Sequence, residues 1–357
     1  NLSFHASASI APNDPKAAEQ WGLGMIDARA AGGVTTGSPS TIVAVLDTGI
    51  DVNSPEFAGR LWVNPNASNR FRTVHGWNFV DNNTNVTDTH GHGTHVAAII
   101  AAAGNDGIGV AGLNWNATIM PLKVLDARGD GSTDKAVSAI YFAVDNGAKV
   151  INASWGGDTY SQAMFDALNY ANSKGVVFVT AAGNEGVNND VVTSYPASYR
   201  LPNVLSVASV DRYGNLAYDS NHGGGTVDLA APGVDVLSAI PGGFATYSGT
   251  SMATAFVSGT VSLLAGLRPD LSAASLVDRV RSAVKPLPSL AGKTISGGVV
   301  DPYEVLKHET PVTITLVAAP TSNRSASTFP RFASYRPVAP MVPTRRPVRW
   351  PVRRPLR

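Results

Sequence analysis

The amino-acid sequence predicts an α/β fold in which helices cover both faces of a mainly parallel central sheet. Three observations lead to this prediction. Strand-length runs of apolar residues recur along the chain, and stretches with helical periodicity separate them. The runs do not alternate with polar residues, which is typical of strands buried on both faces. Right-handed crossovers between parallel strands produce this alternation of strand and helix.

Each element follows from its own pattern. Five apolar runs predict strands, at Ile42–Leu46, Met120–Leu125, Val150–Ser154, Val176–Ala181 and Val204–Val207. Helical patterns lie between them, at Gly93–Ala103, Thr133–Asn146 and Ser161–Lys174. The small and apolar residues Met252–Leu267 predict a buried helix, Ser272–Val284 and Pro302–Leu306 predict closing helices, and Val312–Ala318 fits a last strand. No apolar run reaches the roughly 18 residues of a membrane span.

Composition divides the chain into two regions. Nine of the 27 basic residues, all arginine, lie in residues 311–357, which contain no acidic residue and nine of the 23 prolines. We therefore expect an acidic globular body, residues 1–310, and a Pro/Arg-rich tail that is disordered from Ala319. The tail suits an anionic surface, and no specific nucleic acid is expected as a partner. Cysteine is absent, which excludes disulfides and a thiol nucleophile.

Three motifs place a carboxylate, an imidazole and a hydroxyl in the order Asp–His–Ser. Asp47 ends the first predicted strand, before Thr48-Gly49. The second motif is Asp-Thr-His-Gly-His-Gly-Thr-His-Val-Ala, residues 88–97. Ser251 follows Gly-Thr and opens the long buried helix, where unpaired N–H groups and the helix dipole favour negative charge. This order is one of three in which hydrolytic triads occur.

Three histidines of the second motif compete for the role of general base. His95 lies among apolar residues at the start of a helix, which favours a buried structural histidine. His90 fits an exposed turn, and His92 stands between two glycines at the helix entrance. The residue types alone leave the choice open.

Taken together, the motifs resemble those of subtilisin-type serine proteases, in particular the bacterial thermitase-like branch, over roughly residues 11–308. The resemblance implies a subtilisin-like three-layer fold and a catalytic triad of Asp47, His92 and Ser251, with His92 at the base position of the family's HGTHVA motif. Residues 181–186, Ala-Ala-Gly-Asn-Glu-Gly, match the segment that supplies a side-chain donor to the oxyanion, which is Asn184 here.

Two further segments resemble the walls of the family's substrate cleft. The first would pair with an extended peptide as an added strand and comprises Ser154, Trp155 and Gly156. The second would line the pocket for the residue before the scissile bond and comprises Ala181, Ala182 and Gly183. Small walls leave room for large apolar side chains, whereas Ser194, where many relatives have glycine, would shorten the pocket floor.

The resemblance also implies structural Ca²⁺, whose hard oxygen ligands the sequence offers. A loop interrupts the apolar helix after Ala103, and the implied ligands are the side chains of Asp14, Glu56 and Asp106 with the carbonyls of Ala103, Ile108 and Val110. An ordinary Asn-Asp-Gly turn stays the alternative, because Glu56 replaces the usual aspartate. A second ion site of weaker affinity is suggested by five oxygen-bearing residues: Asn78, Asp81, Asn83, Asn85 and Thr87.

The expected function is that of a secreted, monomeric serine endopeptidase that cleaves protein and peptide substrates through an acyl-enzyme. Residues 1–10 carry no signal-peptide pattern, which fits a mature form. The alternatives are a catalytically silent peptide-binding relative, a surface-anchoring protein whose tail is the functional part, and an acid-acting sedolisin-type peptidase. The sedolisin type uses glutamate in place of histidine, and the motif around His92 argues against it.

Overall fold

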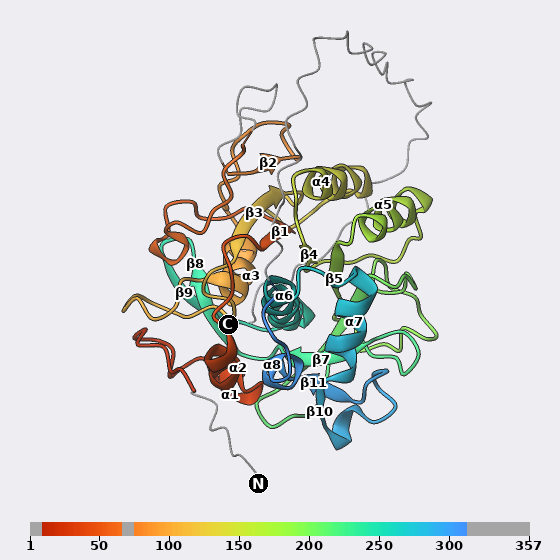
Figure 1. Ribbon diagram of the computed structural model, residues 1–357. Coiled ribbons are helices and arrows are strands. Elements are labelled where there is room, and N and C mark those ends of the chain that lie inside the picture. The colour runs from red at the N-terminus through yellow and green to blue at the C-terminus, as the bar shows by residue number, and fades with distance from the viewer. Residues whose placement is uncertain (1–8, 66–74, 313–357) are drawn as a thin grey trace, which may run out of the picture.

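The computed structural model describes residues 9–65 and 75–312. A mainly parallel sheet with helices on both faces forms its centre, which confirms the predicted α/β class (Figure 1). The strands of the sheet are β1 (Ile42–Asp47), β2 (Trp77–Asn78), β3 (Thr118–Lys123), β4 (Val150–Ala153), β5 (Val177–Ala181), β6 (Val204–Val210), β7 (Leu229–Pro232), β10 (Val284–Pro286) and β11 (Gly298–Val300).

The order across the sheet is β10-β11-β7-β6-β5-β4-β1-β3-β2. Neighbouring strands are parallel apart from the antiparallel pair β10 and β11. β8 (Val236–Ile240) and β9 (Gly243–Tyr247) form a separate antiparallel pair. The helices are α1 (Trp21–Met25), α2 (Ala28–Val34), α3 (His92–Ala101), α4 (Thr133–Asp145), α5 (Gln162–Ser173), α6 (Thr250–Leu267), α7 (Ala273–Ser282) and α8 (Pro302–Leu306), with short 3₁₀ turns at Pro55–Phe57 and Pro288–Leu290.

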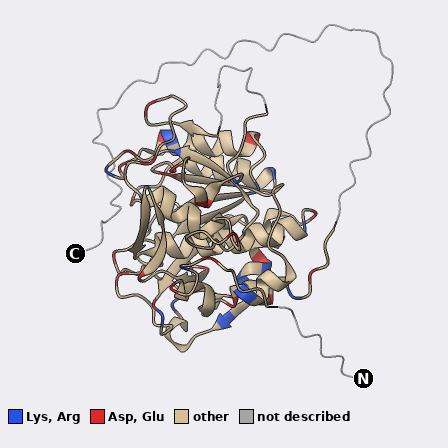
Figure 2. Ribbon diagram, turned by 90° about the vertical axis from the view of Figure 1, so that its left-hand side faces the viewer, with Lys and Arg blue, Asp and Glu red and all other residues tan. Residues whose placement is uncertain are grey.

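Successive residues of each central strand face two different apolar layers. In β1, Val43 and Val45 pack in the layer that contains α3 and α6, whereas Ala44 and Leu46 pack in the layer that contains α4 and α5. Since side chains alternate along a strand, both sets must be largely apolar, and this is why the strand runs consist mostly of apolar residues. Charged residues lie mainly on outer loops and helix ends (Figure 2).

Helix α6 occupies the middle of the larger layer. Its 18 residues have a mean hydropathy of 1.4, so by length and composition it is able to cross a membrane, which corrects the expectation that no segment is long enough. However, 94% of the helix is buried inside the described part of the molecule. It is a core helix of the folded body, as the run Met252–Leu267 predicted.

Strand β3 begins and ends two residues earlier than predicted. The N–H groups of Val124 and Leu125 both donate to the carbonyl oxygen of Asp47, which turns the chain away from the sheet. Strands β7 to β11 were not predicted, since their short runs of small residues, prolines and alternating exposure give no long apolar signal. The strand expected at Val312–Ala318 lies outside the described residues, except Val312, whose N–H donates to Leu267.

Removing residues 319–357 should leave the melting temperature within about 2 °C of the full chain, a change below roughly 1 kcal/mol for a protein of this size. The reason is compositional: repeated proline and like charge prevent this segment from burying a core. Differential scanning calorimetry of both chains makes the comparison. A loss of 10 °C or more would place part of the segment within the folded body and contradict the predicted boundary.

Candidate active site

Three neighbouring strands end at one edge of the sheet, and a predicted site residue stands at or just after the end of each. Asp47 is the last residue of β1, Ser154 follows β4, and Asn184 follows β5. The amino ends of α3 and α6 bring His92 and Ser251 to the same edge. The last four of these line one open cleft of about 1610 Å³, and Asp47 is fully buried behind His92. Sites in parallel α/β sheets form at this edge.

The Asp47 and His92 side chains form a buried hydrogen-bonded pair. His92 Nδ1 lies 2.7 Å from Asp47 Oδ1, and the two side chains are 4% and 0% exposed. Gly93 permits this approach of α3 to the end of β1, because a Cβ atom at position 93 would lie 2.2 Å from the carbonyl oxygen of Gly49. The pair leaves Nε2 as the nitrogen of His92 that is not held by Asp47.

The surroundings of His92 favour its protonated form. Burial lowers the pKa of the imidazole, but the charge and hydrogen bond of Asp47, with a contribution from Asp88, outweigh burial and hold the pKa above its usual value. A positive charge that forms on this ring is therefore stabilised by the protein itself.

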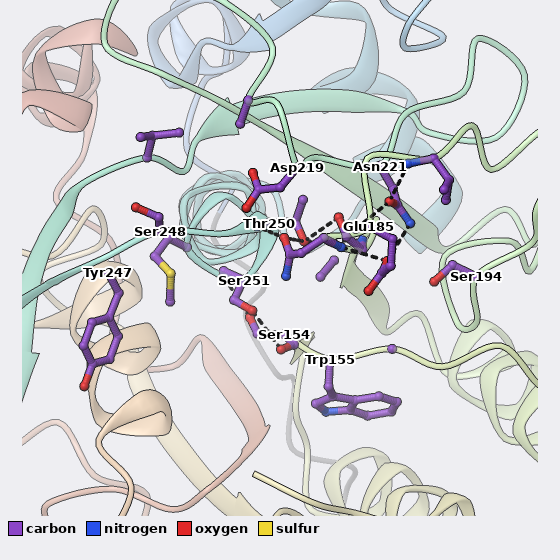
Figure 3. Close-up of a pocket in the computed structure, with 18 of the residues that line it drawn as sticks. Ser154, Trp155, Glu185, Ser194, Asp219, Asn221, Tyr247, Ser248, Thr250 and Ser251 are labelled. Carbon is purple, nitrogen blue, oxygen red and sulfur yellow. Dashed lines mark hydrogen bonds between the residues drawn. The ribbon is translucent and has the colours of Figure 1, made fainter. Parts of the chain in front are cut away.

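Ser251 lies in the first turn of α6, where its hydroxyl donates to the carbonyl oxygen of Ser154 at 3.0 Å (Figure 3). Among the described residues, no hydrogen bond joins this hydroxyl to His92. As placed here, the hydroxyl of Ser251 is bonded to the residue after β4 and not to the imidazole. The turn before it requires Gly249, whose φ of 145° is unfavourable for other residues.

The carboxamide of Asn184 is oriented by Thr250. Its Oδ1 accepts from the backbone N–H of Thr250 at 2.8 Å and lies 2.9 Å from the Thr250 hydroxyl. Both hydrogen bonds are accepted by the amide oxygen of Asn184. Its NH₂ group is therefore free to donate to another acceptor, and it has no hydrogen-bond partner within the described chain. Sequence reasoning missed Thr250, whose position directly before Ser251 was the only signal.

Asp88 is a second residue whose role the sequence did not reveal. Its buried carboxylate accepts from the hydroxyls of Thr48 and Thr94 and from the N–H groups of His90, Gly91 and Thr94. Burial raises the pKa of Asp88, but the hydrogen bonds from Thr94, Gly91 and His90 outweigh burial and hold the pKa below its usual value. They fasten the start of α3 to the loop after β1. An aspartate four residues before the central histidine was the available signal.

The other two histidines of the motif differ in environment. His95 Nε2 lies 3.0 Å from the carbonyl oxygen of Val236 and 3.1 Å from that of Ala245, and the ring stacks on Tyr247 with centroids 4.4 Å apart. Burial lowers the pKa of His95 to about 3, so the ring is neutral. This matches the structural role expected for it. His90 lines the cleft, with its ring centroid 6.3 Å from that of His92.

Most of the predicted substrate-binding residues line the cleft: Ser154, Trp155, Gly156, Ala181 and Gly183. Ala182 does not, because its side chain is fully buried in the layer around α6. The indole of Trp155 is also buried and donates to the Leu46 carbonyl oxygen at 2.7 Å. Asn221, which sequence analysis had not assigned to binding, and Glu185, which it placed at the pocket rim, complete this wall, and Asn221 Nδ2 donates to Glu185 Oε2 at 3.0 Å (Figure 3).

The predicted calcium ligands converge on one loop without forming a closed cage. Glu56 Oε2 accepts from the N–H of Val110 at 3.3 Å, and Asp14 Oδ2 accepts from that of Asn105 at 2.7 Å. Burial, with the charges of Asp106 and Asp14, raises the pKa of Glu56 to about 7. Its Oε1 is buried with no hydrogen-bond partner in the described chain. The described residues nevertheless hold no group of three or more His, Cys, Asp or Glu at metal-binding separation.

The remaining implied ligands are backbone groups of the same loop. Ala103 and Val110 are buried at its two ends, whereas the side chain of Ile108 is 40% exposed. The loop sketched as a second ion site is closed by its own hydrogen bonds instead. Asn78 Nδ2 donates to Asp81 Oδ2 at 3.0 Å and to the Asn85 carbonyl oxygen at 2.8 Å. The N–H of Asp81 also donates to Asn78 Oδ1 at 3.0 Å, so these bonds hold the loop in shape, and a second ion site there stays a prediction.

Comparison with known proteins gives consistent matches. A model described as the subtilase family matches residues 38–296. The chain is 43% identical over 65% of its length to a thermophilic serine proteinase of Bacillus sp. strain AK1, of which the match covers 54%. It is 41% identical over 71% of its length to thermitase of Thermoactinomyces vulgaris, of which the match covers 85%. The match therefore spans about half the length of the first of these relatives.

A solved structure of a protease from Pseudoalteromonas arctica has the same architecture. The two superpose with a TM-score of 0.72 at 29% identity, over 84% of this chain and 99% of the other. Family model, sequence relatives and fold thus agree with the resemblance carried by the three motifs. The chain belongs to the subtilase family of serine proteases.

Proposed function

We propose that this protein is a secreted serine endopeptidase with Asp47, His92 and Ser251 as its triad and Asn184 as an oxyanion donor. The observation that carries the proposal is the buried Asp47–His92 pair, 2.7 Å apart, in the same cleft as a helix-terminal serine and an amide held by Thr250. A silent peptide-binding relative has no use for an imidazole poised in this way.

In the proposed mechanism, Ser251 Oγ attacks the carbonyl carbon of the scissile peptide while His92 Nε2 takes its proton. Asp47 holds the ring in the required tautomer and stabilises the imidazolium. The negative oxygen of the tetrahedral intermediate accepts from the Ser251 N–H and Asn184 Nδ2. His92 then protonates the leaving amine, which gives an acyl-enzyme on Ser251, and water hydrolyses it by the same steps in reverse.

The shape of the cleft favours large apolar side chains before the scissile bond. Its walls there are the small residues Ala181, Gly183 and Gly156. Ser194 limits the depth, since a Cβ atom at position 156 would lie 3.4 Å from Ser194 Oγ. Residues 154–156, directly after β4, correspond to the segment that would pair with a peptide in β conformation. The surface-anchoring alternative depends on the tail, most of which lies outside the described residues.

The substitution Ser251→Ala should leave the fold intact and lower kcat by a factor on the order of 10⁶. This is the effect known for the corresponding serine of subtilisin. Peptide hydrolysis and labelling by an organophosphorus reagent measure this. The unmodified chain should be labelled once, at Ser251. More than trace hydrolysis by the variant would contradict the assignment of the nucleophile, and absence of labelling in the unmodified chain would favour the binding alternative.

Activity should be lost as the pH falls through the pKa of His92, because only the neutral ring can accept the serine proton. Since Asp47 raises this pKa, the midpoint should lie above the ordinary histidine value of about 6.5. Replacing Asp47→Asn removes the charge and should move the midpoint down, alongside a loss of kcat. The pH profile of kcat/KM tests this, with Asp166→Asn on the outer face of α5 as a control that should not shift it. A midpoint below 6 in the unmodified chain would argue against His92 as the base.

We further propose that the loop after Ala103 binds a structural Ca²⁺. The residues fit a cation in chemistry: a buried carboxylate oxygen of Glu56 lacks a partner, and two more carboxylates lie near it. Asp14, Glu56 and Asp106 would hold the ion, with loop carbonyls. An ion here would neutralise the mutual repulsion of the acids and brace the loop, away from the reacting atoms.

Chelation with EDTA should therefore lower the melting temperature, by about 5 °C if the ion is present at 100 times its Kd, a contribution of about 2.7 kcal/mol. Initial activity at moderate temperature should change little. The Asp106→Ala variant should start at the lower melting temperature and no longer respond to EDTA, whereas Asp166→Ala should respond as the unmodified chain does. A melting temperature indifferent to EDTA would refute the calcium proposal.

A further inference from the structure

A series of buried side-chain hydrogen bonds leads from the middle of α6 to the backbone of Ser251. Ser258 Oγ donates to Asn152 Oδ1 at 2.8 Å, and Asn152 Nδ2 donates to Ser154 Oγ at 3.0 Å. Ser154 Oγ donates in turn to the carbonyl oxygen of Ser251 at 2.9 Å. All the donors point the same way along the series, so that each bond polarises the next.

Asn152 is an unusual residue for its position in the sheet. It pairs in register with Val45 of β1 and Val179 of β5, which belong to the apolar layer around α6, and it is 0% exposed. Burying a carboxamide there is unfavourable unless both of its ends are bonded. Within the described chain, the bonds of its side chain are those to Ser154 and Ser258. The burial of Asn152 is thus explained by this series alone.

Ser258 is equally unusual among the hydroxyl residues along α6. Thr254, Thr260 and Ser262 each donate to a backbone carbonyl of their own helix, which is the common arrangement for a buried hydroxyl. Ser258 instead donates across to the side chain of Asn152 in β4. The helix and the strand are joined here by a specific polar contact within an otherwise apolar interface.

We propose that Asn152 and Ser258 are positioning residues for the nucleophile. Ser154 and Ser251 are linked by two reciprocal bonds, since the Ser251 hydroxyl also donates to the Ser154 carbonyl oxygen (Figure 3). By fixing the Ser154 hydroxyl, the series holds the Ser251 backbone against the end of β4 and sets the place from which its Oγ reaches His92. This inference rests on the proposed function, because Asn152 and Ser258 can position a nucleophile only if Ser251 is one.

The same helix offers a matched control. Ser262 is also 0% exposed and also bonded to a buried asparagine, with Asn114 Nδ2 donating to its Oγ at 2.8 Å. This second pair lies about one turn further along α6 and has no bonded path to Ser251 among the described contacts. Comparing Ser258→Ala with Ser262→Ala therefore separates positioning of the nucleophile from general stabilisation of the helix.

We expect Ser258→Ala to lower kcat about tenfold with KM changed less than about twofold, because small displacements of a reacting group are costly. The rate of inactivation by a sulfonyl fluoride, which needs Ser251 but no extended peptide, should fall in parallel. The pH midpoint should stay where it is, since the series does not touch His92. Ser262→Ala should lower the melting temperature to a similar extent with kcat retained. All rates are measured at least 20 °C below the melting temperatures.

A double-mutant cycle completes the test. If Ser154 transmits the effect, the losses of kcat caused by Ser154→Ala and Ser258→Ala should not add. The double variant should then be no slower than the slower single variant. Equal kcat for the Ser258→Ala and Ser262→Ala variants, or fully additive losses in the cycle, would overturn the inference. Absence of hydrolysis or of Ser251 labelling in the unmodified chain would instead overturn the proposed function, so the two failures are distinguishable.

Discussion

The buried Asp47–His92 pair sets the constraint that the rest of the site must satisfy. Two ionisable groups out of water are stable only with good geometry and compensating charge. Asp88 adds a second buried carboxylate nearby, and the buried ammonium of Lys123 donates to the Thr48 carbonyl oxygen at 2.5 Å. With an imidazolium at His92, the two carboxylates and two cations balance. The cluster is therefore electrostatically complete in the protonated state that the proposed reaction creates.

Bringing these groups together requires unusually close contact between helix ends and strand ends. The start of α3 reaches β1 only because position 93 is glycine, and the start of α6 is fastened to the residues after β4 and β5 by Ser154 and Thr250. Such contacts fix positions through backbone atoms, which move less than side chains. The precision of the site thus comes from the packing of the two helices on the sheet, and the polar side chains select one arrangement within it.

The sequence predicted those features that depend on local pattern or on strong motifs. The central strands and helices carry long apolar runs, so they were placed to within a few residues. The residues of the proposed triad stand within short distinctive segments, which is why the sequence alone could name them. Features set by tertiary contact were missed. The early end of β3 follows from the carbonyl of Asp47, which accepts from the N–H groups after the strand. Likewise, nothing in Ala-Ala-Gly shows that Ala182 points into the core while its neighbours line the cleft.

Helix α6 shows why stability and the proposed catalysis cannot be assigned to separate parts of this fold. Its small residues let it lie close to its neighbours; at Gly259, a Cβ atom would stand 3.0 Å from Leu113 Cβ. A bulkier residue there would push the helix outward and move Ser251 with it, since the helix is a rigid rod of backbone hydrogen bonds. The apolar length that resembles a membrane span is therefore a requirement of the site. The proposed nucleophile, Ser251, is held in a fixed position because the helix that carries it is buried along nearly all of its length.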